Sequence, residues 1–226
     1  MSSAHRTIFA ILVFLLSIPA SALAAEPAVP DSAAAVPDSA AAIPDSVATV
    51  PEIQERELKA KIEAHPGDAA LVMDLAAFYY DQGDRSRSEK QYRRVLELDP
   101  RNAAAMVRLG TVLNESAKSE EALVQFDAAL QIEPRRVDTL CRKGQALYAL
   151  KRHEEAVRLY LEAKKIDPKD QSPYYWLGIA FADAGIYREA IVEWTAVVDI
   201  NKDSELGRAA AEGIEVLRPM VGVSGP

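Results

Sequence analysis

The sequence predicts an all-α fold, a right-handed α-solenoid in which helical hairpins stack side by side. Prolines recur every 34 residues, at Pro66, Pro100, Pro134 and Pro168. The intervals between them repeat one apolar pattern, and only 7% of the residues are aromatic. A fixed period of this length is typical of arrays in which each repeat buries its apolar side against a neighbour. We therefore expect four hairpins with a capping helix at each end.

Residues 1–24 have the composition of a secretory signal peptide. His5 and Arg6 form a short polar start, residues 8–18 form an apolar run, and residues 22–24 read Ala-Leu-Ala, as a cleavage site does. The run is much shorter than the ~20 residues that span a bilayer, so a retained anchor is the weaker alternative. No cysteine follows the run, which argues against a lipoprotein tether. We expect an exported protein, periplasmic or extracellular, with no stable membrane span after processing.

Residues 25–51 repeat a short unit of valine or isoleucine followed by proline and an acid, with prolines at 30, 37, 44 and 51. Each proline fixes φ and pushes the preceding residue out of the helical region, so the alanine runs cannot join into one helix. We predict a disordered linker. A weaker hypothesis is that this arm folds back into a groove of the solenoid and competes there with a ligand of the protein.

Residues 52–68 are predicted to form an N-terminal capping helix. The terminal hairpin of an array exposes the apolar side that an inner hairpin buries, so each end needs a polar element. This segment is highly charged, and we expect its apolar residues Ile53, Leu58 and Ile62 to lie on one side.

Four repeats follow, at residues 69–102, 103–136, 137–170 and 171–204. In each repeat the fourth and eleventh positions are large and apolar, the eighth is small, and the twentieth is alanine or serine. The twenty-fourth position is always aromatic: Tyr92, Phe126, Tyr160 and Trp194. Glycine inside a helix costs about 0.5–1 kcal/mol relative to alanine. Glycine at the eighth position in Gly110, Gly144 and Gly178 therefore predicts a close helix crossing there.

This pattern resembles the tetratricopeptide repeat family, whose members place large, small, large and aromatic residues at these positions and proline at the thirty-second. The resemblance covers residues 69–204, in four units without an insertion. It departs locally, because Ser88 replaces alanine and Lys202 replaces a fifth proline. Lys143 stands where the other repeats have leucine, and we expect its stem to cover the core with its ammonium group in water.

The resemblance implies a concave groove, lined by five positions of the first helix of each repeat. Here those positions hold small, apolar and aromatic residues with a few amides, which suits a peptide with apolar anchors. The expected groove residues are Met73, Tyr80, Val107, Thr111, Asn114, Cys141, Gln145, Tyr148, Tyr175 and Ile179. Of the basic clamp with which chaperone-docking relatives hold a terminal carboxylate, only Arg142 matches, so we reject that ligand.

Basic residues also repeat with the units, after each terminating proline and one turn into the first helix. They form a basic ladder of Arg101, Arg108, Arg135, Arg142 and Lys169. Such a ladder suits an acidic polymer, so the alternative function is an accessory protein of polysaccharide synthesis or export. The simpler interpretation is a solvated edge that nearby acids balance.

Residues 205–218 are predicted to form the C-terminal capping helix, and residues 219–226 a disordered tail. One side of the helix is apolar, with Leu206, Ala210, Ile214 and Leu217. Polar caps at both ends favour a discrete particle over end-to-end growth, so we expect a monomer or a weak dimer.

Composition and motifs argue against several classes of function. A net charge of −8 without a basic tract disfavours nucleic acid as the partner. The three histidines are dispersed, and the sequence has no zinc, triad or phosphate-loop motif, so we expect no enzyme, no metal and no cofactor. Cys141 is alone and is either a small buried hydrophobe or an exposed thiol. We predict an exported scaffold that binds a peptide segment of an envelope or secreted protein.

Overall fold

The computed structural model describes residues 49–222 of the chain. By internal contacts the chain divides into two units, residues 1–50 and 51–226, and the helical hairpins lie in the second. The predicted signal peptide and nearly all of the predicted linker lie outside the described residues. Within residues 49–222 all regular structure is helical, and no helix there is long and apolar enough to cross a bilayer.

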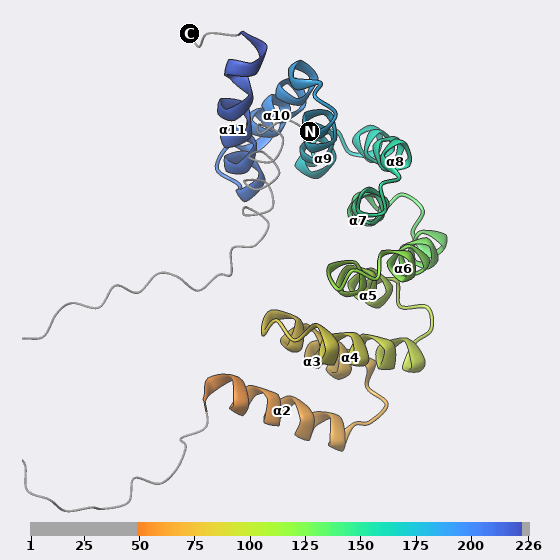
Figure 1. Ribbon diagram of the computed structural model, residues 1–226. Helices are drawn as coiled ribbons and strands as arrows, with labels where there is room; N and C mark the ends of the chain where they lie inside the picture. Colours follow the sequence, from red (N-terminus) through yellow and green to blue (C-terminus); the bar gives the residue numbers. More distant parts are fainter. Residues whose placement is uncertain (1–48, 223–226) are drawn as a thin grey trace, which may run out of the picture. The chain divides into compact units, whose positions relative to one another are not determined.

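Four helical hairpins follow the helix α2 (Val50–Ala64). They are α3 (Ala69–Asp81) with α4 (Arg85–Leu98), α5 (Ala103–Glu115) with α6 (Ser119–Ile132), α7 (Val137–Ala149) with α8 (His153–Ile166), and α9 (Gln171–Asp183) with α10 (Tyr187–Asn201). Then come α11 (Glu205–Leu217) and the 3-10 helix η1 (Arg218–Val221). Each hairpin packs on the next, with α3, α5 and α7 along one side of the row and α4, α6 and α8 along the other (Figure 1). The predicted all-α solenoid of helical hairpins is confirmed.

Side-chain caps determine where most of the first helices begin. An oxygen of the cap accepts a hydrogen bond from a backbone N–H of the first turn, at 2.7–2.9 Å, in Asp68, Asn102, Asp170 and Ser204. Such caps satisfy donors that have no partner inside the helix. The exception is α7, which begins after Arg136 without a side-chain cap. The guanidinium of Arg136 instead pairs with Glu133 at 2.8 Å.

Glycine at the eighth position lies against the aromatic ring of the same hairpin. A Cβ atom added at Gly110, Gly144 or Gly178 would lie 2.6, 2.3 or 2.3 Å from the nearest ring atom, closer than real Cβ atoms approach. The rings concerned are buried: Phe126, Tyr160 and Trp194. The close helix crossing that the sequence predicts is therefore present in three of the four repeats.

The turn within each hairpin passes through the left-handed region at the fifteenth position. Gly83 and Gly185 have φ of +77° there, and Ala117 and Lys151 have φ of +60° and +65°. Glycine adopts this conformation without steric cost, whereas a residue with a Cβ is strained by about 1–2 kcal/mol. The second and third hairpins therefore carry local strain that the first and fourth do not.

The helix α2 contacts the first hairpin along one narrow side. Ile62 is buried and Leu58 half-buried against a cluster that includes Val72 and Phe78, whereas Ile53 is 37% exposed. The expectation that Ile53, Leu58 and Ile62 share one side is wrong for Ile53. Nine residues separate Ile53 from Ile62, which is two and a half turns at 3.6 residues per turn, so the two side chains point in opposite directions.

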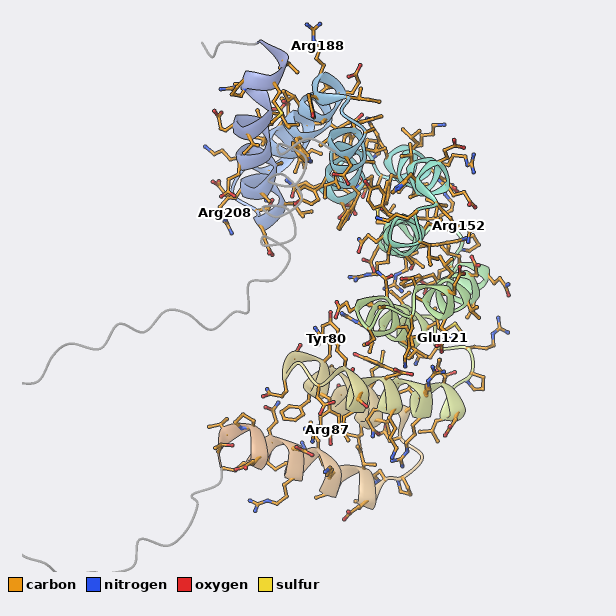
Figure 2. The ribbon with its side chains drawn as sticks, in the orientation of Figure 1. Tyr80, Arg87, Glu121, Arg152, Arg188 and Arg208 are labelled. Atoms are coloured by element: carbon orange, nitrogen blue, oxygen red, sulfur yellow. The ribbon has the colours of Figure 1, made fainter. Side chains whose placement is uncertain are left out.

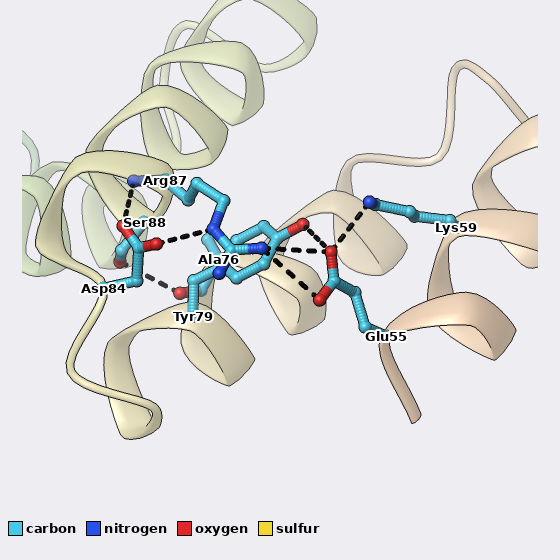
Figure 3. A network of polar contacts seen from close by, with 7 residues as sticks. All are labelled: Glu55, Lys59, Ala76, Tyr79, Asp84, Arg87 and Ser88. Carbon is cyan, nitrogen blue, oxygen red and sulfur yellow. Dashed lines mark hydrogen bonds and ion pairs between the residues drawn. The ribbon is translucent and has the colours of Figure 1, made fainter. Parts of the chain in front are cut away.

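Polar contacts complete the attachment of α2 (Figure 3). Glu55 accepts a hydrogen bond from the Tyr79 hydroxyl at 2.7 Å and pairs with Lys59 at 2.7 Å and Arg87 at 3.2 Å. Arg87 also pairs with Asp84 at 2.6 Å and lies 4.4 Å above the Tyr79 ring. The hydrogen bonds from Lys59 and Tyr79 hold the pKa of Glu55 below its ordinary value. Charged side chains therefore fasten α2 where apolar contact is limited.

The helix α10 ends differently from the other even-numbered helices, because Lys202 replaces the terminating proline. It continues to Asn201, and a glutamine from α9 satisfies its last carbonyls. Gln171 donates from Nε2 to the carbonyl oxygens of Val197 and Asn201 at 2.6 and 2.8 Å, and accepts at Oε1 from Ser204 at 2.8 Å. In place of the proline, the end of α10 is therefore joined by hydrogen bonds to α9 and to the start of α11.

The C-terminal helix α11 buries Ala210, Ile214 and Leu217, and Leu206 is half-buried. The 3-10 helix η1 follows without a break, whereas the sequence led us to expect a disordered tail from residue 219. Proline is tolerated in the first turn of a helix, which accounts for an ordered turn at Pro219. Residues 223–226 lie outside the described range.

Candidate functional site

The candidate site is the surface that α3, α5, α7 and α9 present outside the core, here called the odd-helix face. Seven of the ten predicted groove residues are half-buried on it, with part of each side chain open to solvent: Met73, Tyr80, Thr111, Asn114, Gln145, Tyr148 and Tyr175. They come from all four helices, at registers that recur with the repeats. The hairpin stacking therefore brings side chains from distant parts of the sequence into one row.

The other three predicted groove residues are corrected by the structure. Val107, Cys141 and Ile179 are only 3%, 2% and 4% exposed, so none of them offers a surface to a ligand. The reason is packing between neighbouring first helices, because α5 contacts α7 and α7 contacts α9. Burial also raises the pKa of the Cys141 thiol, so this cysteine is a small buried hydrophobe rather than a reactive group.

Two of the tyrosines bond to the next repeat. The Tyr80 hydroxyl, at the end of α3 (Figure 2), donates to Oε1 of Glu115 on α5 at 2.5 Å. The Tyr148 hydroxyl on α7 donates to Oδ2 of Asp183 on α9. Burial, and then the bond to a carboxylate, raises the pKa of Tyr80 to about 12 and raises that of Tyr148 as well. Both hydroxyls therefore stay protonated and stay donors at physiological pH.

A side chain from the second helix of the hairpin packs on each of these rings. The Arg85 guanidinium lies 4.0 Å from the centre of the Tyr80 ring, and its Nε pairs with Glu115 at 2.6 Å. In the third repeat, His153 at the equivalent position meets the Tyr148 ring edge-on, with 4.4 Å between ring centres. Neither Arg85 nor His153 was assigned a role from the sequence. The sequence does contain a signal for the two tyrosine–carboxylate bonds, because a tyrosine is followed by an acid 35 residues later in both places.

The middle of the odd-helix face is polar. Arg142 pairs through Nε with Asp138 at 2.8 Å and donates from Nη1 to Thr111 at 3.2 Å, across the second and third repeats. Asn114 accepts from the Ser119 hydroxyl at 2.8 Å. Arg142 therefore joins the predicted groove rather than standing free in a basic ladder.

The remaining ladder residues lie at two kinds of location. Arg101, Arg135 and Lys169 are exposed in the turns between hairpins, and Arg108 is exposed on α5. None of these four side chains forms an ion pair within residues 49–222. Lys143, the lysine that stands where the other repeats have leucine, pairs with Asp127 at 2.5 Å. Its ammonium group therefore reaches a carboxylate at the surface.

Trp176 on α9 is a further residue of this face that the sequence pattern did not single out. Its ring stacks on buried Tyr160 with 6.4 Å between centres and meets Tyr175 edge-on at 5.7 Å. Both Tyr175 and Trp176 remain partly exposed. Aromatic rings held in this way offer a large contact area with little loss of side-chain freedom on binding.

The described residues contain no group of three or more histidine, cysteine, aspartate or glutamate side chains that could hold a metal ion. What the odd-helix face offers instead is aromatic, thioether and amide surface in a row. Such groups suit the binding of a chain segment, with rings and methyl groups for apolar anchors and amides for a peptide backbone.

Two segments of the chain match tetratricopeptide repeat families. A model described as tetratricopeptide repeat matches residues 73–137, and one described as TPR repeat matches residues 144–185. The two segments lie within the four hairpins. No curated protein matches the chain.

Solved structures share the fold. MamA from Desulfovibrio magneticus RS-1, residues 41 to the end, aligns with a TM-score of 0.61 at 22% identity, over 68% of this chain and 88% of that chain. YrrB, described as a TPR protein with an unusual peptide-binding site, aligns with a TM-score of 0.55 at 21% identity, over 75% of this chain and 86% of that chain. At these identities the likeness shows the fold alone.

Proposed function

We propose that this protein is an exported, monomeric scaffold that binds a peptide segment of an envelope or secreted protein on its odd-helix face. The observation that carries the proposal is the row of half-buried aromatic, thioether and amide side chains from the first helices of four successive repeats. A fold of the tetratricopeptide type, which commonly serves protein–protein interaction, supports it. The peptide-binding description of the structural neighbour YrrB agrees with it. Export is supported by the composition of residues 1–24.

The geometry suggests how a ligand would be spaced. Packed helices lie about 8–10 Å apart, and an extended peptide advances about 3.3 Å per residue. An extended ligand would therefore place one side chain on each first helix about every third residue. Met73 and Tyr175 lie on the first and the last of these helices, so they would hold opposite ends of the peptide.

A selected peptide tests this function. A 12-residue peptide is chosen from a random display library against the full chain, labelled with fluorescein, and titrated by fluorescence anisotropy. Replacing a buried aromatic anchor commonly costs more than about 1 kcal/mol, so Tyr175→Ala and Met73→Ala should each weaken binding by roughly fivefold or more. The control is Val124→Ala, because Val124 is an apolar residue of α6 that is 62% exposed.

Equal losses in all three variants, or a library that yields no binder, would contradict the proposal. The polymer alternative predicts a different result, because binding through Arg101, Arg108, Arg135 and Lys169 would collapse as salt rises and would survive Tyr175→Ala. The engagement of Arg142 with Asp138 and Thr111 makes this alternative the weaker of the two.

A further inference from the structure

Two junctions between neighbouring first helices share one hydrogen bond, here called the tyrosine clasp. It joins Tyr80 of α3 to Glu115 of α5, and Tyr148 of α7 to Asp183 of α9. In both cases a tyrosine at the twelfth position of one repeat donates to an acid at the thirteenth position of the next. The same contact therefore arises twice, from pairs of residues with the same spacing.

The junction between α5 and α7 lacks the clasp. Its twelfth position is Asn114, which accepts from Ser119 within its own hairpin, and the thirteenth position of the next repeat is Ala149. Alanine has no acceptor on its side chain. The chain thus contains an internal comparison, with two clasped junctions and one unclasped junction at the same register.

The acceptors of both clasps end their helices. Glu115 is the last residue of α5, and Asp183 is the last residue of α9. The final turn of a helix has unpaired carbonyls and opens more readily than its middle. A bond from the neighbouring helix therefore acts where the backbone is least constrained by the helix itself.

The hydroxyl and the ring of each tyrosine make separate contacts. The ring of each tyrosine packs against the core and against Arg85 or His153, and these contacts would survive loss of the hydroxyl. The hydroxyl bonds to a carboxylate, and such charge-assisted bonds are stronger than neutral ones. Phenylalanine in place of tyrosine would separate the two roles.

We propose that Tyr80 and Tyr148 are positioning residues, whose hydroxyls fix the last turns of α5 and α9 against the preceding repeat and so set the spacing of the odd-helix face. The effect on ligand affinity rests on the peptide-binding function proposed above. The effect on helix spacing does not, because it follows from contacts within the chain.

Hydrogen exchange of the full chain, measured by mass spectrometry, tests the structural effect. Tyr148→Phe should speed exchange at the end of α9 by roughly fivefold, as expected for losing one bond to a charged group at a partly exposed site, and leave the end of α5 unchanged. Tyr80→Phe should do the reverse. The matched control is Tyr187→Phe, because Tyr187 is a half-buried tyrosine whose hydroxyl has no hydrogen bond within the described residues.

Building the missing clasp into the junction between α5 and α7 should slow hydrogen exchange instead of speeding it. Asn114→Tyr combined with Ala149→Glu places the tyrosine and the acid at the unclasped junction, and exchange at the end of α7 should slow by roughly fivefold. The proposal is overturned if Tyr80→Phe and Tyr148→Phe change the same regions to the same extent. It is also overturned if neither change exceeds that of Tyr187→Phe.

The display-selected peptide tests the consequence for binding. Tyr148→Phe should weaken its affinity by roughly threefold to fivefold while the ring contact is retained. Faster exchange with unchanged affinity would overturn the positioning role in recognition. A library without a binder would count against the proposed function, and the exchange measurements would still decide whether the clasps fix the helix ends.

Discussion

In the second, third and fourth repeats, glycine at the eighth position is required by the aromatic ring that packs against it. A methyl group at Gly144 would lie 2.3 Å from Tyr160, whose side chain is fully buried and cannot move aside into solvent. Alanine is the better helix former by about 0.5–1 kcal/mol, so propensity and packing oppose each other at this position. Packing has the greater effect, because overfilling a core costs about 1–3 kcal/mol.

We therefore predict that Gly144→Ala lowers the free energy of unfolding by about 1–2 kcal/mol, as measured by urea denaturation. The control is Gly67→Ala, in the turn before α3, where an added Cβ meets nothing within 4 Å. That variant should be neutral or slightly stabilising. A stabilised Gly144→Ala would mean that the ring has room to move.

The turns give a prediction of the opposite sign. Lys151 has φ of +65° at a position where the first and fourth hairpins have glycine. Lys151→Gly should raise the free energy of unfolding by about 0.5–1 kcal/mol, since relief of strain exceeds the entropy cost of glycine. Gln82→Gly, at a residue with φ of −77°, should lower it instead. Equal effects of the two changes would show that the turn is not strained.

At the scale of the helix, α2 depends on charge more than the hairpins do. Only one residue of α2, Ile62, is buried. Glu55 joins the helix to the first hairpin through its contacts with Tyr79 and Arg87. The pKa of Glu55 is lowered in the folded protein, so its contribution is complete above the ordinary value near 4.5 and is lost as pH falls through the lowered value. The helix α5, which buries residues along most of its length, should show much less of this dependence.

We predict that acid releases α2 before the hairpins. Below about pH 4.5, exchange in α2, corrected for the intrinsic effect of pH, should rise relative to exchange in α5. Glu55→Gln should show the faster exchange of α2 already at pH 7 and should remove most of its dependence on pH. Parallel changes in α2 and α5 would contradict a separate attachment.

The helices could be predicted from the sequence because each depends on local signals, namely a 34-residue period, caps and terminating prolines. Most of the details that differ depend on contacts between repeats. Ile53 is the exception, because the spacing of nine residues between it and Ile62 already places the two side chains on opposite sides of one helix. The burial of Val107, Cys141 and Ile179 does not follow from the repeat pattern, because no single repeat reveals how closely the next first helix packs. The clasps need an acid from one repeat and a tyrosine from another, which a pattern within one repeat cannot show.

For the whole molecule, export is the prediction that the described helices do not address. Residues 22–24 read Ala-Leu-Ala, so cleavage should leave Ala25 as the first residue of the mature protein. Edman sequencing of the protein purified from its native cells checks this directly. A mature chain that retains residues 8–18 would favour the anchor alternative instead.

The row of hairpins makes one surface from parts that are far apart in the sequence. Each first helix contributes only a few exposed groups, and a peptide would need several helices at once to gain useful affinity. By the role proposed above, the Tyr80 and Tyr148 hydroxyls would act on this surface by holding two of its three pairs of neighbouring first helices together. It also predicts that binding a peptide protects α3, α5, α7 and α9 together.

The central claim is that the odd-helix face is the binding surface, and one difference measurement tests it most directly. Hydrogen exchange of the full chain is compared with and without the saturating display-selected peptide. We predict slower exchange in at least three of α3, α5, α7 and α9, with α6 and α8 unchanged. Protection confined to α4, α6, α8 and α10, or to α2 and α11 at the ends, would contradict it.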